Sequence, residues 1–157
     1  MGLFSRKKKT DVGDIKESVK IIRDVLAKIG ISGSPQPIDG GKGFGWILQR
    51  GSAVVYVMIN EIDGKGFFKV VSPIIYLPTE NLLPLYRTIL EINMDLTNAA
   101  LGVQEDKICV VSERSVAGLD SVEAEEIIKR VAYYADELDN KLVSEFGGRL
   151  FSDPHGR

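Results

Sequence analysis

Apolar residues between positions 44 and 76 fall into three short runs separated by turn-forming residues. The runs cover residues 44–49, 53–60 and 67–76, with Arg50-Gly51 and Asp63-Gly64 between them. Asp-Gly between two apolar runs is a strong signal for a tight hairpin, because both residues tolerate a positive φ. The pattern therefore predicts a meander of three antiparallel strands, around which the rest of the chain is organised.

Both faces of this meander are apolar. Successive side chains of a strand point to opposite faces of the sheet. In the second strand these side chains are Val54, Tyr56 and Met58 on one face and Val55, Val57 and Ile59 on the other. A sheet with one face in water would instead alternate apolar and polar residues. We therefore expect helices to cover one face, and more of the chain, a second copy or a partner to cover the other.

Two amphipathic helices are predicted at the ends of the folded region. Apolar residues recur every three or four positions in residues 11–29 and 120–146, which is the spacing of one helix face. Asp120 and Glu123 form a capping-box pattern at the start of the second of these helices. Gly147-Gly148 is expected to end it.

A further helix is predicted over residues 79–96. Pro84 is tolerated only in a first helical turn, so the helix is expected to start near Asn81. Its apolar residues form a broad band, with Leu82, Leu85, Ile89 and Ile92 on one side and Leu83, Tyr86 and Leu90 beside them. A band of this width predicts cover on two sides, one of which a second subunit can supply.

The remaining segments complete one α+β domain. Residues 99–103 and 108–114 are predicted to form a second hairpin, and residues 32–43, rich in Gly and Pro, a loop. The element order is then helix, three strands, helix, two strands, helix. We assign residues 1–10 to a disordered basic tail, 11–147 to the single domain, and 148–157 to a flexible C-terminal tail.

Composition fits a soluble globular domain with an uneven distribution of charge. The chain has 157 residues, 44% of them hydrophobic, and a formal net charge of −2. Four of its 20 basic residues lie in the first ten positions, which leaves 16 basic against 22 acidic residues in the remainder. An acidic body argues against a nucleic-acid-binding surface. A single cysteine and the lack of an apolar run of about 20 residues predict a cytoplasmic protein.

The N-terminal tail raises one alternative. Its notable residues are Leu3, Phe4, Arg6, Lys7, Lys8 and Lys9. Each basic residue near an anionic membrane surface contributes about 1 kcal/mol. The tail is therefore expected either to be solvated or to make a weak contact with a membrane surface.

No set of residues predicts a reaction. Cys109 lies in an apolar strand and is expected to be a small buried hydrophobe, because a catalytic thiol needs a base and the only histidine is His155 in the C-terminal tail. Asp136, Glu137 and Asp139 are expected to form a solvated helix face, since no second acidic cluster or His is near in sequence. We therefore expect no enzyme activity, no catalytic residue, no metal site and no cofactor.

Several local patterns in the second half of the chain carry a family resemblance. They are Leu90-Glu91-Ile92-Asn93, the strand entry Asn98-Ala99-Ala100-Leu101-Gly102, the acidic turn after it, and Leu119 followed by Ala135-Asp136-Glu137-Leu138. With the element order, they make the chain similar to YbjN-like domains and type III secretion chaperones. The resemblance implies an α+β fold with helices on a five-stranded antiparallel sheet, dimerisation, and chaperone-like or adaptor binding of another polypeptide. It implies neither a cofactor nor a reaction.

The leading hypothesis is a non-enzymatic homodimer that holds a partner polypeptide on apolar sheet surface. The residues expected to contact the partner are Val55, Val57, Ile59, Phe68, Val70 and Ile74. The alternatives are a peripheral membrane-surface adaptor tethered by the basic N-terminal tail and a small-molecule-binding domain.

Overall fold

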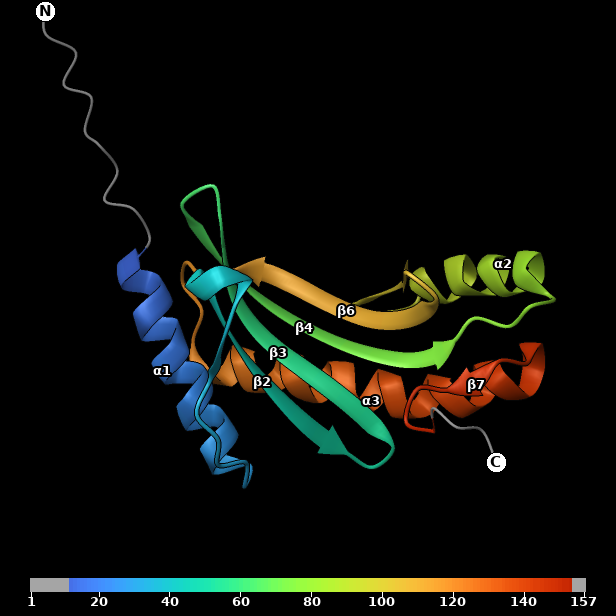
Figure 1. The fold of residues 1–157 in the computed structure, drawn as a ribbon, viewed down its shortest axis with the longest axis horizontal. Coiled ribbons are helices and arrows are strands. Elements are labelled where there is room, and N and C mark those ends of the chain that lie inside the picture. Colours follow the sequence, from blue (N-terminus) through green and yellow to red (C-terminus); the bar gives the residue numbers. More distant parts are fainter. Residues whose placement is uncertain (1–11, 154–157) are drawn as a thin grey trace, which may run out of the picture.

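The computed structural model of the protein describes residues 12–153, which form three α-helices and one antiparallel sheet (Figure 1). The helices are α1 (Val12–Lys28), α2 (Leu82–Asn93) and α3 (Ser121–Phe146), and a 3-10 turn, η1, covers Asp39–Gly41. The strands are β1 (Gln36–Ile38), β2 (Gly43–Arg50), β3 (Ala53–Ile62), β4 (Lys65–Tyr76), β5 (Ala100–Gln104), β6 (Lys107–Ser115) and β7 (Arg149–Leu150). The strand order is β1-β2-β3-β4-β6-β5, and β7 pairs with β4. The α+β architecture is confirmed.

The meander forms as the turn residues predict. Asp63 and Gly64 join β3 to β4 with φ values of 51° and 74°, the positive pair that a tight hairpin turn requires. The first turn is one residue later than predicted, because Arg50 pairs with Ala53 and Gly51-Ser52 forms the loop.

Two short strands extend the predicted five. Residues 36–38, predicted to lie in a loop, form β1 and pair only with β2. Pro37 is compatible with this position because an edge strand leaves one side unpaired. Arg149 and Leu150, assigned to a flexible tail, instead pair with Tyr76 and Ile75 of β4.

The helix ends follow local chemistry. The Asp120 carboxylate accepts a hydrogen bond of 2.9 Å from the backbone N–H of Glu123, which confirms the predicted cap of α3. Gly147 ends α3 with φ 84°, and its N–H donates to the carbonyl of Val143 at 2.9 Å. Pro84 lies in the first turn of α2, as predicted.

All three helices help to cover one face of the sheet. α1 and α3 contact each other and both contact β3 and β4, while α2 contacts β5 and α3. An ion-pair cluster joins α1 to α3, since Glu125 binds Lys129 at 2.5 Å and Lys28 at 2.8 Å. Hydrogen bonds from Lys129 and Lys28 lower the pKa of Glu125 to about 2. α2 is fixed to the sheet edge by Asn93, whose side chain binds the backbone N–H and carbonyl of Leu101.

Candidate functional site

The six residues predicted to contact a partner lie in the core. Val55, Val57, Ile59, Phe68 and Val70 are 0% exposed and Ile74 is 4% exposed. They belong to the hydrophobic cluster that the helices and the sheet enclose. A partner cannot reach them without opening the fold, so the choice of this face as the contact face was wrong.

The opposite face of the same strands is not covered by any helix of the described residues. Along β3 every second residue from Ala53 to Ile59 is buried, and the residues between them are partly exposed. Strand register extends this pattern into a row of side chains that crosses five strands. The row is Ile47, Tyr56, Val71, Val111 and Ala100. We call this side of the sheet the open face.

Side chains at the centre of the open face are buried, and those on its outer strands are exposed. Ile47 on β2 is 66% exposed, whereas Val71 on β4 is 7% exposed among its neighbours. Met58 and Lys69 form the adjacent cross-strand pair, and Lys69 binds Glu113 of β6 at 3.3 Å. Lys107 of β6 also binds Glu105, at 3.1 Å. The face therefore offers apolar side chains flanked by ion pairs.

Two hollows lie along the open face. One, of about 550 Å³, includes Val71, Pro73 and Phe151 in its lining, and the other, of about 480 Å³, includes Ile47 and residues 31–34. Ile38, Tyr56 and Met58 line both hollows. The two hollows therefore meet at β3, which produces a groove across the strands rather than a single closed cavity.

Glycines of β2 lie against Ile38 at the junction of these hollows. A Cβ atom at Gly43 would lie 3.0 Å from Cγ1 of Ile38 and 2.7 Å from the carbonyl oxygen of Ile59, so the missing side chain at Gly43 leaves room for Ile38 to lie beside the sheet. Gly45 pairs with Met58, and β1 places Ile38 opposite Gly43. The short strand β1 thus completes one wall of the groove.

A second apolar surface lies on α2 and β5. Its residues are Leu83, Leu90 and Met94, at the α2 surface and end, and Val103 on β5, each at least half exposed. Leu85 and Ile89 on the other side of α2 are buried. The predicted broad band is therefore present, and only one side of it is covered within this chain.

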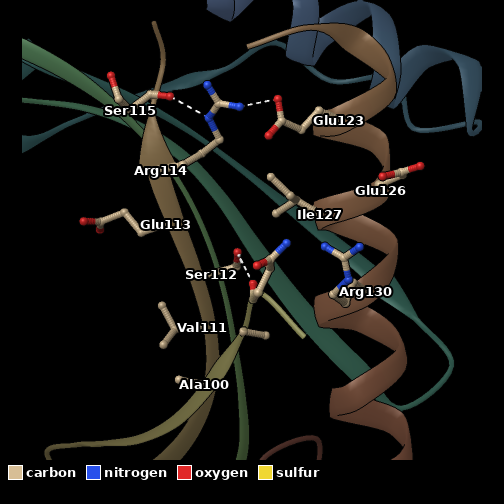
Figure 2. Close-up of a pocket in the computed structure, with 12 residues that line it drawn as sticks. Ala100, Val111, Ser112, Glu113, Arg114, Ser115, Glu123, Glu126, Ile127 and Arg130 are labelled. Carbon is tan, nitrogen blue, oxygen red and sulfur yellow. Dashed lines mark hydrogen bonds and ion pairs between the residues drawn. The ribbon is translucent and has the colours of Figure 1, made fainter. Parts of the chain in front are cut away.

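A third hollow is polar and lies between β6 and α3. Figure 2 shows Arg114 pointing from β6 towards α3, while Val111 and Glu113 point to the other side of the strand. Arg114 forms an ion pair with Glu123 and donates to the carbonyl of Ser115 at 2.7 Å (Figure 2). It also donates to the carbonyl of Ala117, at 2.7 Å. This hollow measures about 700 Å³. Arg130, Glu123 and Glu126 also line this hollow. Because its lining is charged, the hollow is less suited than the open face to an apolar segment.

The residues considered for chemistry have structural roles. Cys109 is 4% exposed, and its burial raises the pKa of its thiol, which opposes formation of a nucleophilic thiolate. Asp139 is 3% exposed rather than solvated. It accepts a hydrogen bond of 2.9 Å from Ser52, and Asp136 accepts one of 3.2 Å from the same hydroxyl. These aspartates hold the β2–β3 turn against α3.

Some candidate positions lie outside the described residues. These are the membrane-contact candidates Leu3, Phe4, Arg6, Lys7, Lys8 and Lys9, together with His155. Within residues 12–153 no three metal-ligating side chains gather into a group that could hold an ion. No helix in that range has the length and apolarity needed to cross a membrane.

A family model described as T3SS (YopN, CesT) and YbjN peptide-binding chaperone 1 matches residues 18–154. The chain belongs to this family. The match includes every described strand together with α2 and α3, so the membership expected from the sequence is confirmed.

Solved structures share the chaperone-like fold. A chain of the ExsC–ExsE complex has a TM-score of 0.60 and 13% identity, and the match covers 82% of this chain and 95% of that one. A chain of the HopA1–SchA chaperone–effector complex has a TM-score of 0.56 and 8% identity, and the match covers 83% of this chain and 98% of that one. A chain of the complex of the Yersinia pestis type III secretion chaperone SycH with a YscM2 fragment has a TM-score of 0.53 and 12% identity. That match covers 76% of this chain and 98% of that one. No curated protein matches the sequence.

Proposed function

We propose that this chain is a non-enzymatic chaperone-like protein that holds an extended segment of a partner polypeptide on its open face and acts as a homodimer. The observation that carries the proposal is the row of apolar side chains from Ile47 to Ala100, which no described helix covers. Membership of a peptide-binding chaperone family supports a polypeptide as the ligand.

The shape of the open face favours an extended segment. The two hollows meet at Tyr56 and Met58 and run across successive strands. An extended peptide places alternate side chains on one side, so it can fill both hollows in turn. Each side chain of Ile or Phe size that becomes fully buried contributes about 1.5–3 kcal/mol, before the cost of ordering the peptide.

The decisive test is a peptide array probed with the full chain and with an Ile47→Asp/Met58→Asp double variant. We expect the wild-type protein to bind a subset of peptides rich in apolar residues. The double variant should bind them at least about tenfold more weakly, because two carboxylates would have to lose water beneath the peptide.

Val122→Asp supplies a matched control for the array. Val122 is 66% exposed, the same fraction as Ile47, but lies near the start of α3. This variant should bind the array as the wild type does. Equal loss of binding in both variants, or no loss in the double variant, would contradict the assignment of the open face.

The homodimer is supported by the second apolar surface. Leu90 and Met94 are 69% and 85% exposed, and burial against a second copy would remove that surface from water. β5 is the last strand on its side of the sheet, so its free edge lies next to the same surface. We therefore place the dimer interface on α2 and β5.

Membrane-surface tethering by the N-terminal tail is the second candidate function. It is favoured by the sequence of that tail, in which Leu3 and Phe4 precede four basic residues. The full chain should sediment with vesicles containing anionic lipid, and a variant lacking residues 1–10 should not. Vesicles of neutral lipid provide the control, since the basic residues gain nothing from them. Unchanged sedimentation after the deletion would exclude this role.

A further inference from the structure

The short strand β7 occupies a position on β4 that the meander leaves vacant. β3 pairs with β4 only as far as Tyr56 and Val71. Beyond that point β4 continues to Tyr76, and β7 fills the place beside it by pairing Leu150 with Ile75 and Arg149 with Tyr76. On its other side the same stretch of β4 pairs with β6. β7 therefore lies where an added strand would complete the sheet.

Few backbone hydrogen bonds hold β7 beside β4, but its side chains make specific contacts. The ladder has two residue pairs, and the N–H of Phe151 adds one bond of 2.9 Å to the carbonyl of Ile74. The guanidinium of Arg149 lies 4.2 Å from the centre of the Tyr76 ring, and the ring of Phe151 lies 5.6 Å from the same ring. Leu150 packs against the hydrophobic core. A basic, an aliphatic and an aromatic residue are thus each recognised in turn.

Charge near β7 favours a basic residue at its first position. Asp106 lies in the β5–β6 turn and hydrogen-bonds Lys107 at 2.6 Å. Leu77, which follows the β4 stretch, donates its N–H to the Asp106 carbonyl at 2.8 Å. Lys107 lies 5.8 Å from the Tyr76 ring on which Arg149 also lies, but its ammonium group is paired with two carboxylates, since Glu105 binds it as well, at 3.1 Å. The acidic turn therefore borders the place where the basic residue binds.

The end of β7 leads into the groove on the open face. Phe151 lines the hollow of about 550 Å³ together with Tyr56, Met58, Val71 and Pro73. Phe151, the residue that follows β7, thus fills one end of the surface on which we place the partner polypeptide. A peptide bound beside β4 would continue directly into that groove.

Gly148 makes this arrangement possible. Its φ is +86°, and a Cβ atom there would lie 2.5 Å from the Tyr76 carbonyl oxygen. Glycine therefore allows the chain to turn back from the end of α3 and to run beside β4.

We propose that the edge of β4 at residues 74–76 is a strand-addition site for an extended peptide with the pattern basic–aliphatic–aromatic, and that residues 149–151 are its resident occupant. A partner segment displaces β7 and takes over its contacts, as in the addition of a peptide strand to a sheet. This inference deepens the proposed function and rests on it, because the same partner extends from β4 onto the open face.

The probe is a fluorescently labelled peptide with the sequence of residues 147–157, added in trans to the full chain. The wild-type chain should bind it weakly, because its own β7 competes. A full-length Leu150→Ala/Phe151→Ala variant should bind it at least about tenfold more tightly. A peptide carrying the same two substitutions should bind neither chain. Full-length Val122→Ala should bind the probe as weakly as the wild type does.

Two results would overturn the proposal. One is equal affinity of the probe for the wild type and the double variant when both unfold cooperatively. The other is loss of cooperative thermal unfolding in the double variant, because β7 would then be an integral part of the core and not a displaceable occupant.

Hydrogen exchange of the wild-type chain gives an independent measurement. The Phe151 amide should exchange at least about tenfold faster than the Leu77 amide, since local opening exposes weakly held segments first. Equal protection of the two amides would overturn the proposal that a partner segment displaces β7.

The peptide array separates this inference from the proposed function. If the trans peptide binds the double variant while the array shows no loss for Ile47→Asp/Met58→Asp, the β4 site stands and the open-face function fails. If the array result holds and the trans peptide does not bind, the open-face function stands and the β4 site fails.

Discussion

Replacing Val57 with aspartate is expected to abolish cooperative unfolding, whereas Met58→Asp, one residue further along β3, should leave the protein folded. Val57 is 0% exposed and pairs with Trp46 and Val70 in the covered face of the sheet. A carboxylate there would be buried among apolar side chains without a cationic partner. Burial of such an unpaired charge lowers the free energy of unfolding by more than about 4 kcal/mol, which is comparable with the whole stability of many domains.

Met58→Asp tests the opposite face of the same strand. Met58 is partly exposed and pairs across the sheet with Lys69. The Lys69 ammonium group, which binds Glu113, can also form an ion pair with the new carboxylate. We expect the free energy of unfolding to change by no more than about 1 kcal/mol. Urea titration followed by circular dichroism measures the free energy of unfolding of both variants. A folded Val57→Asp protein, or an unfolded Met58→Asp protein, would reverse the assignment of covered and open faces.

Local sequence patterns were sufficient to predict most of the architecture. Asp63-Gly64 and the Asp120 cap specify their turn and helix start through backbone geometry and one hydrogen bond, so they depend little on the rest of the fold. The width of the apolar band on α2 predicted cover on two sides. The chain itself buries Leu85 and Ile89 on one side, while Leu90 on the other is 69% exposed, so cover of the second side stays a prediction.

The choice between the two faces of the sheet could not be made from β3 alone. Both faces of that strand are apolar, and the side to be covered depends on where α1 and α3 pack. The neighbouring strands do contain a signal. Lys69 of β4 and Glu113 of β6 both point to the open face, where they form an ion pair, and a buried face would disfavour them. Combining the strands by register would have identified the open side.

The strands β1 and β7 were missed for a different reason. Each has three residues or fewer, which is too short for an alternating pattern to appear. β7 is specified by tertiary contacts, namely its pairing with Ile75 and the turn at Gly148. Such contacts join residues more than seventy positions apart, so no local reading of the tail could have predicted them.

Leu90→Asp is expected to convert the proposed homodimer into a monomer. In a symmetric interface each substitution appears twice, so a carboxylate would be placed at two positions that are apolar in the wild type. Desolvation of these charges should raise the dimer dissociation constant by at least about 100-fold, equivalent to about 2.8 kcal/mol. Analytical ultracentrifugation over a range of protein concentrations measures this change.

Val122→Asp is again the matched control, because Val122 and Leu90 are exposed helical residues of 66% and 69% exposed fraction. It should leave the dissociation constant unchanged. A wild-type chain that sediments as a monomer at micromolar concentration, or a Leu90→Asp chain that still dimerises, would exclude the interface on α2 and β5.

The dimer prediction also bears on the length of the bound segment. Ala100 of β5 ends the apolar row of the open face, and β5 is the last strand on that side of the sheet. If two copies meet along β5, their open faces join, and one partner segment can lie on both. Leu90→Asp should then weaken binding of a long peptide while leaving the affinity for a short one unchanged, because the second copy adds contacts only to a segment that reaches it. Equal weakening for both lengths would show that the α2 surface contacts the peptide itself.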